Sequence, residues 1–130
     1  MGIFSKLFGD SNALPVEEKV LPWIFLTNEA QLERIKKDSF QKVQVIFKHS
    51  TGCGISSMVM NKFVKNFNLD VMAVDLYYLD LLSYRSVSDA VAFQFQVVHQ
   101  SPQLLIIKDG EVVHSASHYD IDANRISDFI

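Results

Sequence analysis

The chain has 130 residues, a length typical of a single domain, and 48% of them are hydrophobic, enough to fill one core. Its formal net charge of -3 gives no sign of the clustered basic surface typical of nucleic-acid binding, so we expect no nucleic-acid partner. No apolar run reaches the roughly 18 residues of a membrane-spanning helix, so we expect no membrane span.

Residues 1–15 are predicted to form an amphipathic segment and linker ahead of the main domain, residues 16–130. Four apolar side chains between positions 3 and 8 fall at helical spacing. A single lysine among them gives little attraction to lipid, so this stripe is expected to cover the core rather than contact a membrane. The segment is also too short and interrupted to be a secretory signal.

Cys53 is the only cysteine, so an internal disulfide and a cysteine-rich zinc site are both excluded within one chain. Without a secretory signal, one unpaired thiol favours a reducing compartment, and we expect a cytoplasmic protein. No metal site is predicted. His114 and His118 are four positions apart, but they follow a strand and are interpreted as solvated hairpin residues.

The first half of the chain is predicted to alternate strands with helices. Runs of branched and aromatic residues predict strands, and apolar residues recurring every three or four positions predict helices. The expected elements are an edge strand at 23–26, a helix from Asn28 (with Gln31 completing a capping box) to about Asp38, a buried strand at 43–47 and a helix after Cys53.

The second half is predicted to end in a hairpin and a closing helix. The dipeptide Asp109-Gly110 between two apolar runs is a strong signal for a tight hairpin turn. The expected elements are a strand at 70–75, a helix over 87–98 capped by Ser86 or Ser88, paired strands at 104–107 and 112–113, and a helix near 126–130.

This order predicts an α/β protein with a mixed sheet of four to five strands between two helical layers. It is similar to the order of elements in the thioredoxin fold. Ferredoxin-like and small doubly wound folds share parts of it, so the order alone leaves them open.

Cys53 is predicted to lie between the end of a strand and the start of the following helix. The unpaired amides and positive dipole end of a helix N-terminus favour a thiolate, the nucleophilic form of cysteine. The amides of Ile55 and Ser56 are the expected donors, and Gly52 and Gly54 leave both flanks bare for an approaching sulfur.

A lone cysteine is more often a small buried apolar residue than a reactive thiol. The residues before Cys53 favour the reactive thiol here. Ser50 and Thr51 are polar, and they argue against burial. Lys48 and His49 would add positive charge if their side chains turned toward the loop.

Ser56 stands three positions after Cys53, where a dithiol oxidoreductase has its second cysteine. Serine cannot resolve a mixed disulfide, although its hydroxyl can donate a hydrogen bond to a thiolate. A disulfide formed on Cys53 must therefore be released by a thiol from outside the chain.

Ser101-Pro102 precedes the fourth predicted strand. In the thioredoxin fold a cis-proline opens the strand that faces the catalytic cysteine, so the resemblance predicts a cis peptide here. It also implies that the Ser101 backbone binds an extended substrate. His99 and Gln100 either line this cleft or cap a helix.

The segment Phe47-Lys-His-Ser-Thr-Gly-Cys-Gly-Ile-Ser56 resembles the active-site segment of the YtxJ-type bacillithiol-system monothiol bacilliredoxins. The resemblance extends to the Trp23 strand, the Gln100-Ser-Pro102 segment and the hairpin turn. Gly54 stands where that family commonly has proline. The resemblance implies that Cys53 takes a low-molecular-weight thiol from S-thiolated client proteins, with bacillithiol or a similar thiol as co-substrate and no tightly bound cofactor.

Two alternatives stay open. Cys53-Gly-Ile-Ser56 is close to the Cys-Gly-Phe-Ser of monothiol glutaredoxins, which resemble iron–sulfur cluster carriers. That family's threonine-valine-proline triplet and glycine-glycine-aspartate turn are absent here. A redox-inert adaptor that uses the fold for protein contacts is the other alternative.

Overall fold

The computed structural model describes residues 19–130, so the predicted N-terminal segment and linker, residues 1–15, lie outside the described residues. The elements in chain order are β1 (Ile24–Phe25), α1 (Ala30–Asp38), β2 (Val43–His49), α2 (Gly54–Asn66), β3 (Val74–Asp80), α3 (Arg85–Gln94), β4 (Gln103–Lys108), β5 (Glu111–Ser117) and the 3₁₀ helices η1 (His118–Asp120) and η2 (Ala123–Phe129).

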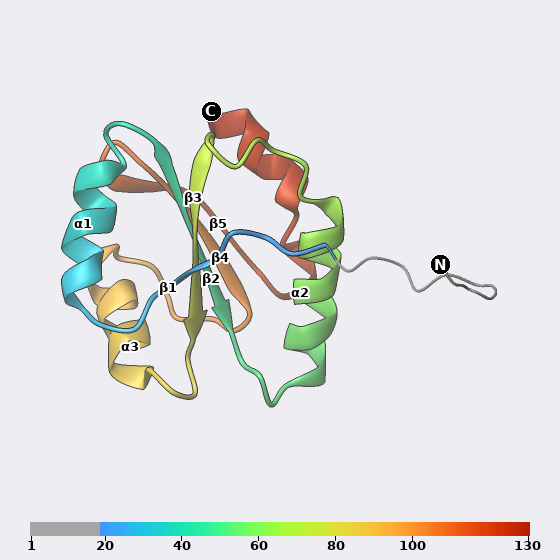
Figure 1. Ribbon diagram of the computed structural model, residues 1–130. Coiled ribbons are helices and arrows are strands. Elements are labelled where there is room, and N and C mark those ends of the chain that lie inside the picture. The colour runs from blue at the N-terminus through green and yellow to red at the C-terminus, as the bar shows by residue number, and fades with distance from the viewer. Residues whose placement is uncertain (1–18) are drawn as a thin grey trace, which may run out of the picture.

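The sheet has five strands in the order β1-β3-β2-β4-β5. The first three strands along the chain run parallel to one another, β4 runs antiparallel to β2, and β5 runs antiparallel to β4. Figure 1 shows α1 and α3 on one face of this sheet and α2 with η2 on the other. The predicted three-layer α/β/α architecture with a mixed sheet is confirmed. No helix within residues 19–130 is long and apolar enough to cross a membrane.

Strand β2 lies at the centre, and every one of its residues is buried. Because side chains alternate along a strand, its odd-numbered residues face one helical layer and its even-numbered residues face the other. Phe47 packs with Phe63 of α2 in one core cluster, whereas Ile46 packs with Leu32 of α1 in the second. Consecutive residues at the end of β2 therefore enter different environments.

The sequence prediction of a strand at 70–75 is wrong. Residues 71–73 form a turn, and β3 begins at Val74 and continues to Asp80. Asp70 causes the turn, because its side chain accepts the N–H of Met72 and its carbonyl accepts the N–H of Ala73. An Asp that bonds the backbone two residues later favours a turn over a sheet ladder.

Helix α3 is shorter than predicted, and neither Ser86 nor Ser88 caps it. The helix begins at Arg85 with Tyr84 in the N-cap position, and both serines lie inside it. It ends at Gln94, since Gln96 adopts φ 55°, a left-handed conformation that a helix cannot continue through.

The predicted hairpin and α1 capping box are confirmed. Asp109 and Gly110 have φ 53° and 83°, which are values of a two-residue hairpin turn, and β4 pairs with β5 around them. The N–H of Asn28 donates to Gln31 Oε1 and the N–H of Gln31 donates to Asn28 Oδ1. The closing helix is present as η2, in 3₁₀ form, with the Asp122 side chain accepting at its start.

Candidate active site

Cys53 lies at the N-cap of α2, directly after the loop that follows β2, as the sequence predicts. Its backbone is extended (φ −110°, ψ 124°), and its carbonyl accepts the N–H of Ser57 at 3.1 Å. The Cys53 N–H donates to the Ser50 carbonyl at 3.1 Å, which closes the loop. The residue is half-buried. The single cysteine is thus held by its backbone, with its side chain at the start of a 13-residue helix.

The prediction that the amides of Ile55 and Ser56 donate to the sulfur is wrong for this structure. The Cys53 side chain makes no capping hydrogen bond. The helix N-terminus still presents its unpaired N–H groups around Cys53.

Ser56 has a different role from the predicted donor to the thiolate. Its side chain is fully buried, and its Oγ lies 2.8 Å from His49 Nδ1. The same Oγ accepts the N–H of Ser50 at 3.0 Å. These two partners join the end of β2 and the loop start to the first turn of α2. Ser56 therefore fixes the loop that carries Cys53.

His49 turns toward α2 but supplies no positive charge to the loop. It is buried against the rings of Phe47 and Tyr78, at centroid distances of 6.4 and 5.7 Å. Burial lowers the pKa of His49 from its ordinary value of 6.5, and the Asp80 carboxylate only partly offsets this. The imidazole is consequently neutral at pH 7.

Lys48 points into the opposite layer, so the prediction that it turns toward the cysteine loop is wrong. It alternates with Phe47 and His49 along β2, and its side chain is fully buried on the α3 side. The ammonium donates to the Ser88 carbonyl at 3.3 Å and lies 3.2 Å from His99 Nδ1. Burial lowers the pKa of Lys48 from 10.5 to about 8, against the raising effect of Asp89.

The remaining loop residues leave Cys53 accessible. Thr51, Gly52, Gly54 and Ile55 are exposed, and Ser50 is half-buried. A Cβ on Gly52 would come within 3.6 Å of Leu82 Cδ1, whereas a Cβ on Gly54 would meet nothing within 4 Å. The approach of a second sulfur past the two glycines stays a prediction, and their exposure is consistent with it.

The Ser101-Pro102 peptide is cis, which confirms the expectation from the resemblance. Gln103 pairs with Lys48 in the antiparallel register of β4 and β2, so Pro102 comes one position further, beside His49. Ser101 Oγ is buried and has no hydrogen-bond partner among the described residues. Binding of substrate by Ser101 and Pro102 remains a prediction.

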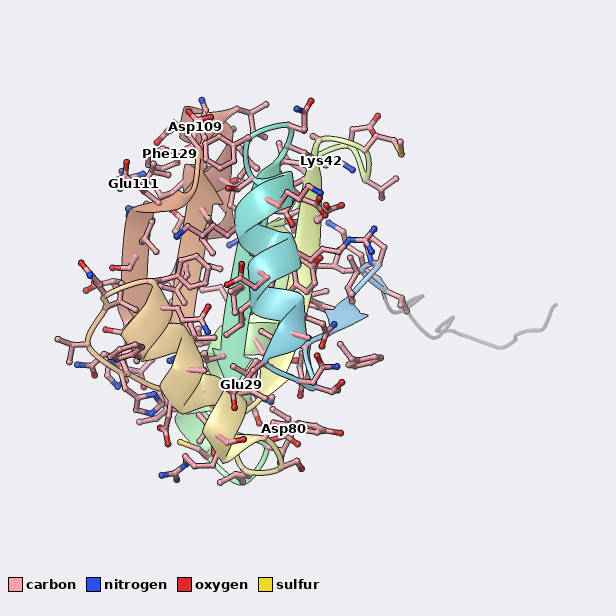
Figure 2. The ribbon with its side chains drawn as sticks, turned by 90° about the vertical axis from the view of Figure 1, so that its left-hand side faces the viewer. Glu29, Lys42, Asp80, Asp109, Glu111 and Phe129 are labelled. Atoms are coloured by element: carbon pink, nitrogen blue, oxygen red, sulfur yellow. The ribbon has the colours of Figure 1, made fainter. Side chains whose placement is uncertain are left out.

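These residues gather at one end of the sheet. Figure 2 shows Asp80, at the end of β3, at the opposite end of the molecule from Lys42 and Asp109. Asp80 anchors the neighbouring loop, because its carboxylate accepts the N–H of Leu82 and the hydroxyl of Ser83. In Figure 1 the β2–α2 and β3–α3 loops lie together at the lower end of the ribbon.

Two histidines considered for metal binding lie elsewhere. His114 stacks on Phe129 at 5.6 Å, and His118 begins η1. Within residues 19–130, no group of three or more His, Cys, Asp or Glu side chains could hold a metal ion.

Sequence reasoning missed the role of Ser88, which contacts both Lys48 and His99 from inside α3. It also left the role of His99 open between cleft lining and helix capping. Helix α3 ends at Gln94 and its C-cap is Phe95, so His99 is not its cap. The alternation of β2 was the available signal, since it already separates Lys48 from His49.

Comparison with known proteins supports the interpretation of this site. The model of the family described as "Monothiol bacilliredoxin BrxC" matches residues 24–126, which include every site residue named above. A solved structure described as having a thioredoxin fold is 31% identical, with a TM-score of 0.69, and the match covers 82% of this chain and 91% of that one.

More distant structures share the fold. The thioredoxin of Malassezia sympodialis has 17% identity and a TM-score of 0.62, with 91% of this chain and 94% of that chain covered. Spinach chloroplast thioredoxin f has 18% identity and a TM-score of 0.60, with 82% and 84% covered. At these identities the likeness concerns the fold.

Proposed function

Because the chain belongs to the monothiol bacilliredoxin family and has an oxidoreductase-type thioredoxin fold, we propose that it removes a low-molecular-weight thiol from protein mixed disulfides through Cys53. The observation that carries the proposal is that Cys53 lies at the start of α2, while a serine, Ser56, occupies the position at which a dithiol enzyme has its second cysteine. No second thiol is present in the chain. Bacillithiol is the family's thiol and is the first candidate for the substrate.

The reaction has two thiol–disulfide exchanges. The Cys53 thiolate attacks the small-thiol sulfur of the client's mixed disulfide, and the client cysteine leaves as a thiolate. A Cys53–small-thiol disulfide results. A second small-thiol thiolate then attacks the small-thiol sulfur of that disulfide, which frees Cys53 and produces the oxidised, disulfide-linked dimer of the small thiol. The two electrons come from the small-thiol pool, so no bound cofactor is needed.

The site offers each exchange a physical advantage. Helix α2 directs unpaired N–H groups and the positive end of its dipole toward a thiolate at its start. The exposed glycines on both sides of Cys53 admit the linear arrangement of three sulfurs that exchange requires. The buried Ser56 hydroxyl keeps the loop in place without offering a competing nucleophilic thiol.

The test is a de-thiolation assay with a client that has one accessible cysteine, loaded with bacillithiol or with glutathione. We expect the wild type to release the small thiol catalytically in excess of the same free thiol. Cys53→Ser should release none, whereas Ser57→Ala, a change one residue beyond Ser56 in the same helical turn, should keep the activity.

Two outcomes would overturn the proposal. Wild-type protein that releases neither thiol would contradict it, and so would equal release by Cys53→Ser. A coloured dimer after anaerobic reconstitution with iron, sulfide and glutathione, together with no de-thiolation, would favour a cluster carrier instead.

A further inference from the structure

The contact between Lys48 and His99 fixes which nitrogen of the His99 ring carries the proton. Lys48 Nζ lies 3.2 Å from His99 Nδ1, and Ser88 Oγ lies 3.3 Å from the same nitrogen. An ammonium group has donors and no acceptor, so Nδ1 must accept. The neutral imidazole then carries its proton on Nε2. The ring is a fixed, uncharged donor.

His99 is exposed to solvent, and within residues 19–130 its Nε2 has no hydrogen-bond partner. Its electrostatic surroundings favour an anion. Burial lowers the pKa of His99 most, the positive charges of Lys48 and Arg85 lower it further, and Asp89 raises it. The Lys48 ammonium, 3.2 Å from Nδ1, is the cation that the structure places against this ring.

The position of His99 in the chain brings its Nε2–H group to the same end of the sheet as the loop that carries Cys53. His99 lies two residues before Ser101 and three before the cis Pro102. The register of β4 on β2 brings Pro102 beside His49, at the end of the strand that leads to Cys53. Lys48, on β2 itself, ties the ring to this strand. His99 therefore lies near the end of the sheet from which the chain continues into the loop that carries Cys53.

We propose that His99, held by Lys48, is a specificity-determining residue that donates its Nε2–H to a carboxylate of the small thiol. The proposal rests on the proposed function and deepens it, because it selects small thiols with an acidic group over neutral ones. Lys48 is the positioning residue: it does not touch the substrate, but it sets the ring's tautomer and direction. Hydrogen bonds to charged acceptors have the strength that such discrimination requires.

The test loads one client protein with mercaptosuccinate, a dicarboxylate, or with 2-mercaptoethanol, which is neutral. The readout is the ratio of kcat/KM for the two clients. We expect the wild type to prefer the acidic client, and His99→Ala to lower this preference about tenfold, mainly through KM. His99→Gln, which keeps an acceptor for Lys48 and an N–H donor, should restore most of it.

Two further variants separate substrate selection from a structural role. Lys48→Met should lower the acidic preference as His99→Ala does, although it should not lower the free energy of unfolding. Asp89→Asn removes the opposing carboxylate and should raise the preference.

Equal changes in kcat/KM for both clients, or an unchanged ratio in His99→Ala, would overturn the proposal. Failure of the proposed function gives a different result, because the wild type would then release neither small thiol.

Discussion

The Nδ1 of His49 lies 2.8 Å from the Oγ of Ser56, and both side chains are buried. This contact joins the last residue of β2 to the first turn of α2 across the loop that contains Cys53. The Ser50 N–H donates to the same Ser56 oxygen at 3.0 Å, so one hydroxyl fixes the loop at two points. Serine at the resolving position thus has a structural role of its own.

Ser56→Ala should destabilise the protein by about 1–3 kcal/mol, because it leaves the half-buried Ser50 N–H and the buried His49 ring without their partner. Urea denaturation followed by the fluorescence of Trp23, the only tryptophan, measures this. Ser57→Ala is the matched control and should cost less than about 0.5 kcal/mol. Equal losses in the two variants would show that the Ser56 contacts contribute nothing specific.

Acid should weaken the fold through His49. Its pKa is lowered in the folded state from the ordinary 6.5, so the unfolded chain binds a proton first as the pH falls. The stability that neutral His49 contributes to the fold is fully present above about pH 6.5, and it is lost as the pH falls through the pKa of His49 in the folded state. Denaturation curves at about pH 7.5 and about pH 5 should show a smaller loss in His49→Gln than in the wild type. An equal loss of stability between the two pH values in His49→Gln and in the wild type would contradict the role of His49 in acid sensitivity.

Burial of the charged Lys48 side chain lowers the free energy of unfolding, and the size of this loss depends on pH. Its pKa falls from 10.5 to about 8 on folding, and at 1.36 kcal/mol per unit the buried ammonium costs up to about 3 kcal/mol at pH 7. Above pH 8 the folded protein loses the proton before the unfolded chain does, so this cost diminishes as the pH rises toward 10.5.

Lys48→Met should therefore be more stable than the wild type at pH 7, by an amount that shrinks toward about pH 9.5. Chemical denaturation at the two pH values checks this. Lys42→Met is the control: Lys42 makes a partly exposed ion pair with Asp75 at 3.1 Å, so its loss should bring no gain. A stability difference that does not vary with pH would contradict the account of Lys48.

Gly54→Pro should stabilise the protein by about 0.4–1 kcal/mol, because proline restricts the unfolded chain. Gly54 is the first residue of α2, where proline is favoured, and Cys53 already has the extended backbone that must precede it. Thermal unfolding measures the gain.

Gly110→Ala is the opposing control for this substitution. Gly110 has φ +83°, and an added Cβ would lie 2.9 Å from Phe40 Cζ. This variant should be less stable than the wild type. A Gly54→Pro protein that loses as much stability as Gly110→Ala would show that the first turn of α2 needs glycine.

The sequence was sufficient to predict much of this architecture, because local patterns decided it. The change to four-residue spacing after Cys53 placed the thiol at the start of α2, and Asp109-Gly110 placed the hairpin. Strand β3 was misplaced because the apolar residues after Asp70 resemble a strand, whereas the Asp70 side chain makes them a turn. Such local competition is hard to judge from residue types alone.

The polar contacts of the site were beyond sequence reasoning. Lys48 meets Ser88 and His99, which are 40 and 51 residues away along the chain, and only the packing of α3 on β2 brings them together. The Ser56 hydroxyl could have served the thiolate or the loop, and the position of His49 decides for the loop. Long-range packing therefore decided both the contacts of Lys48 and the role of the Ser56 hydroxyl.

The most direct measurement is the intact mass of the protein after one turnover with a client that carries a single small thiol, in the absence of free thiol. The account predicts the mass of the chain plus one small thiol on Cys53, reversed when the same thiol is added, with the client released as a free thiol. A covalent complex of Cys53 with the client, or an unmodified mass beside an unchanged client, would contradict it.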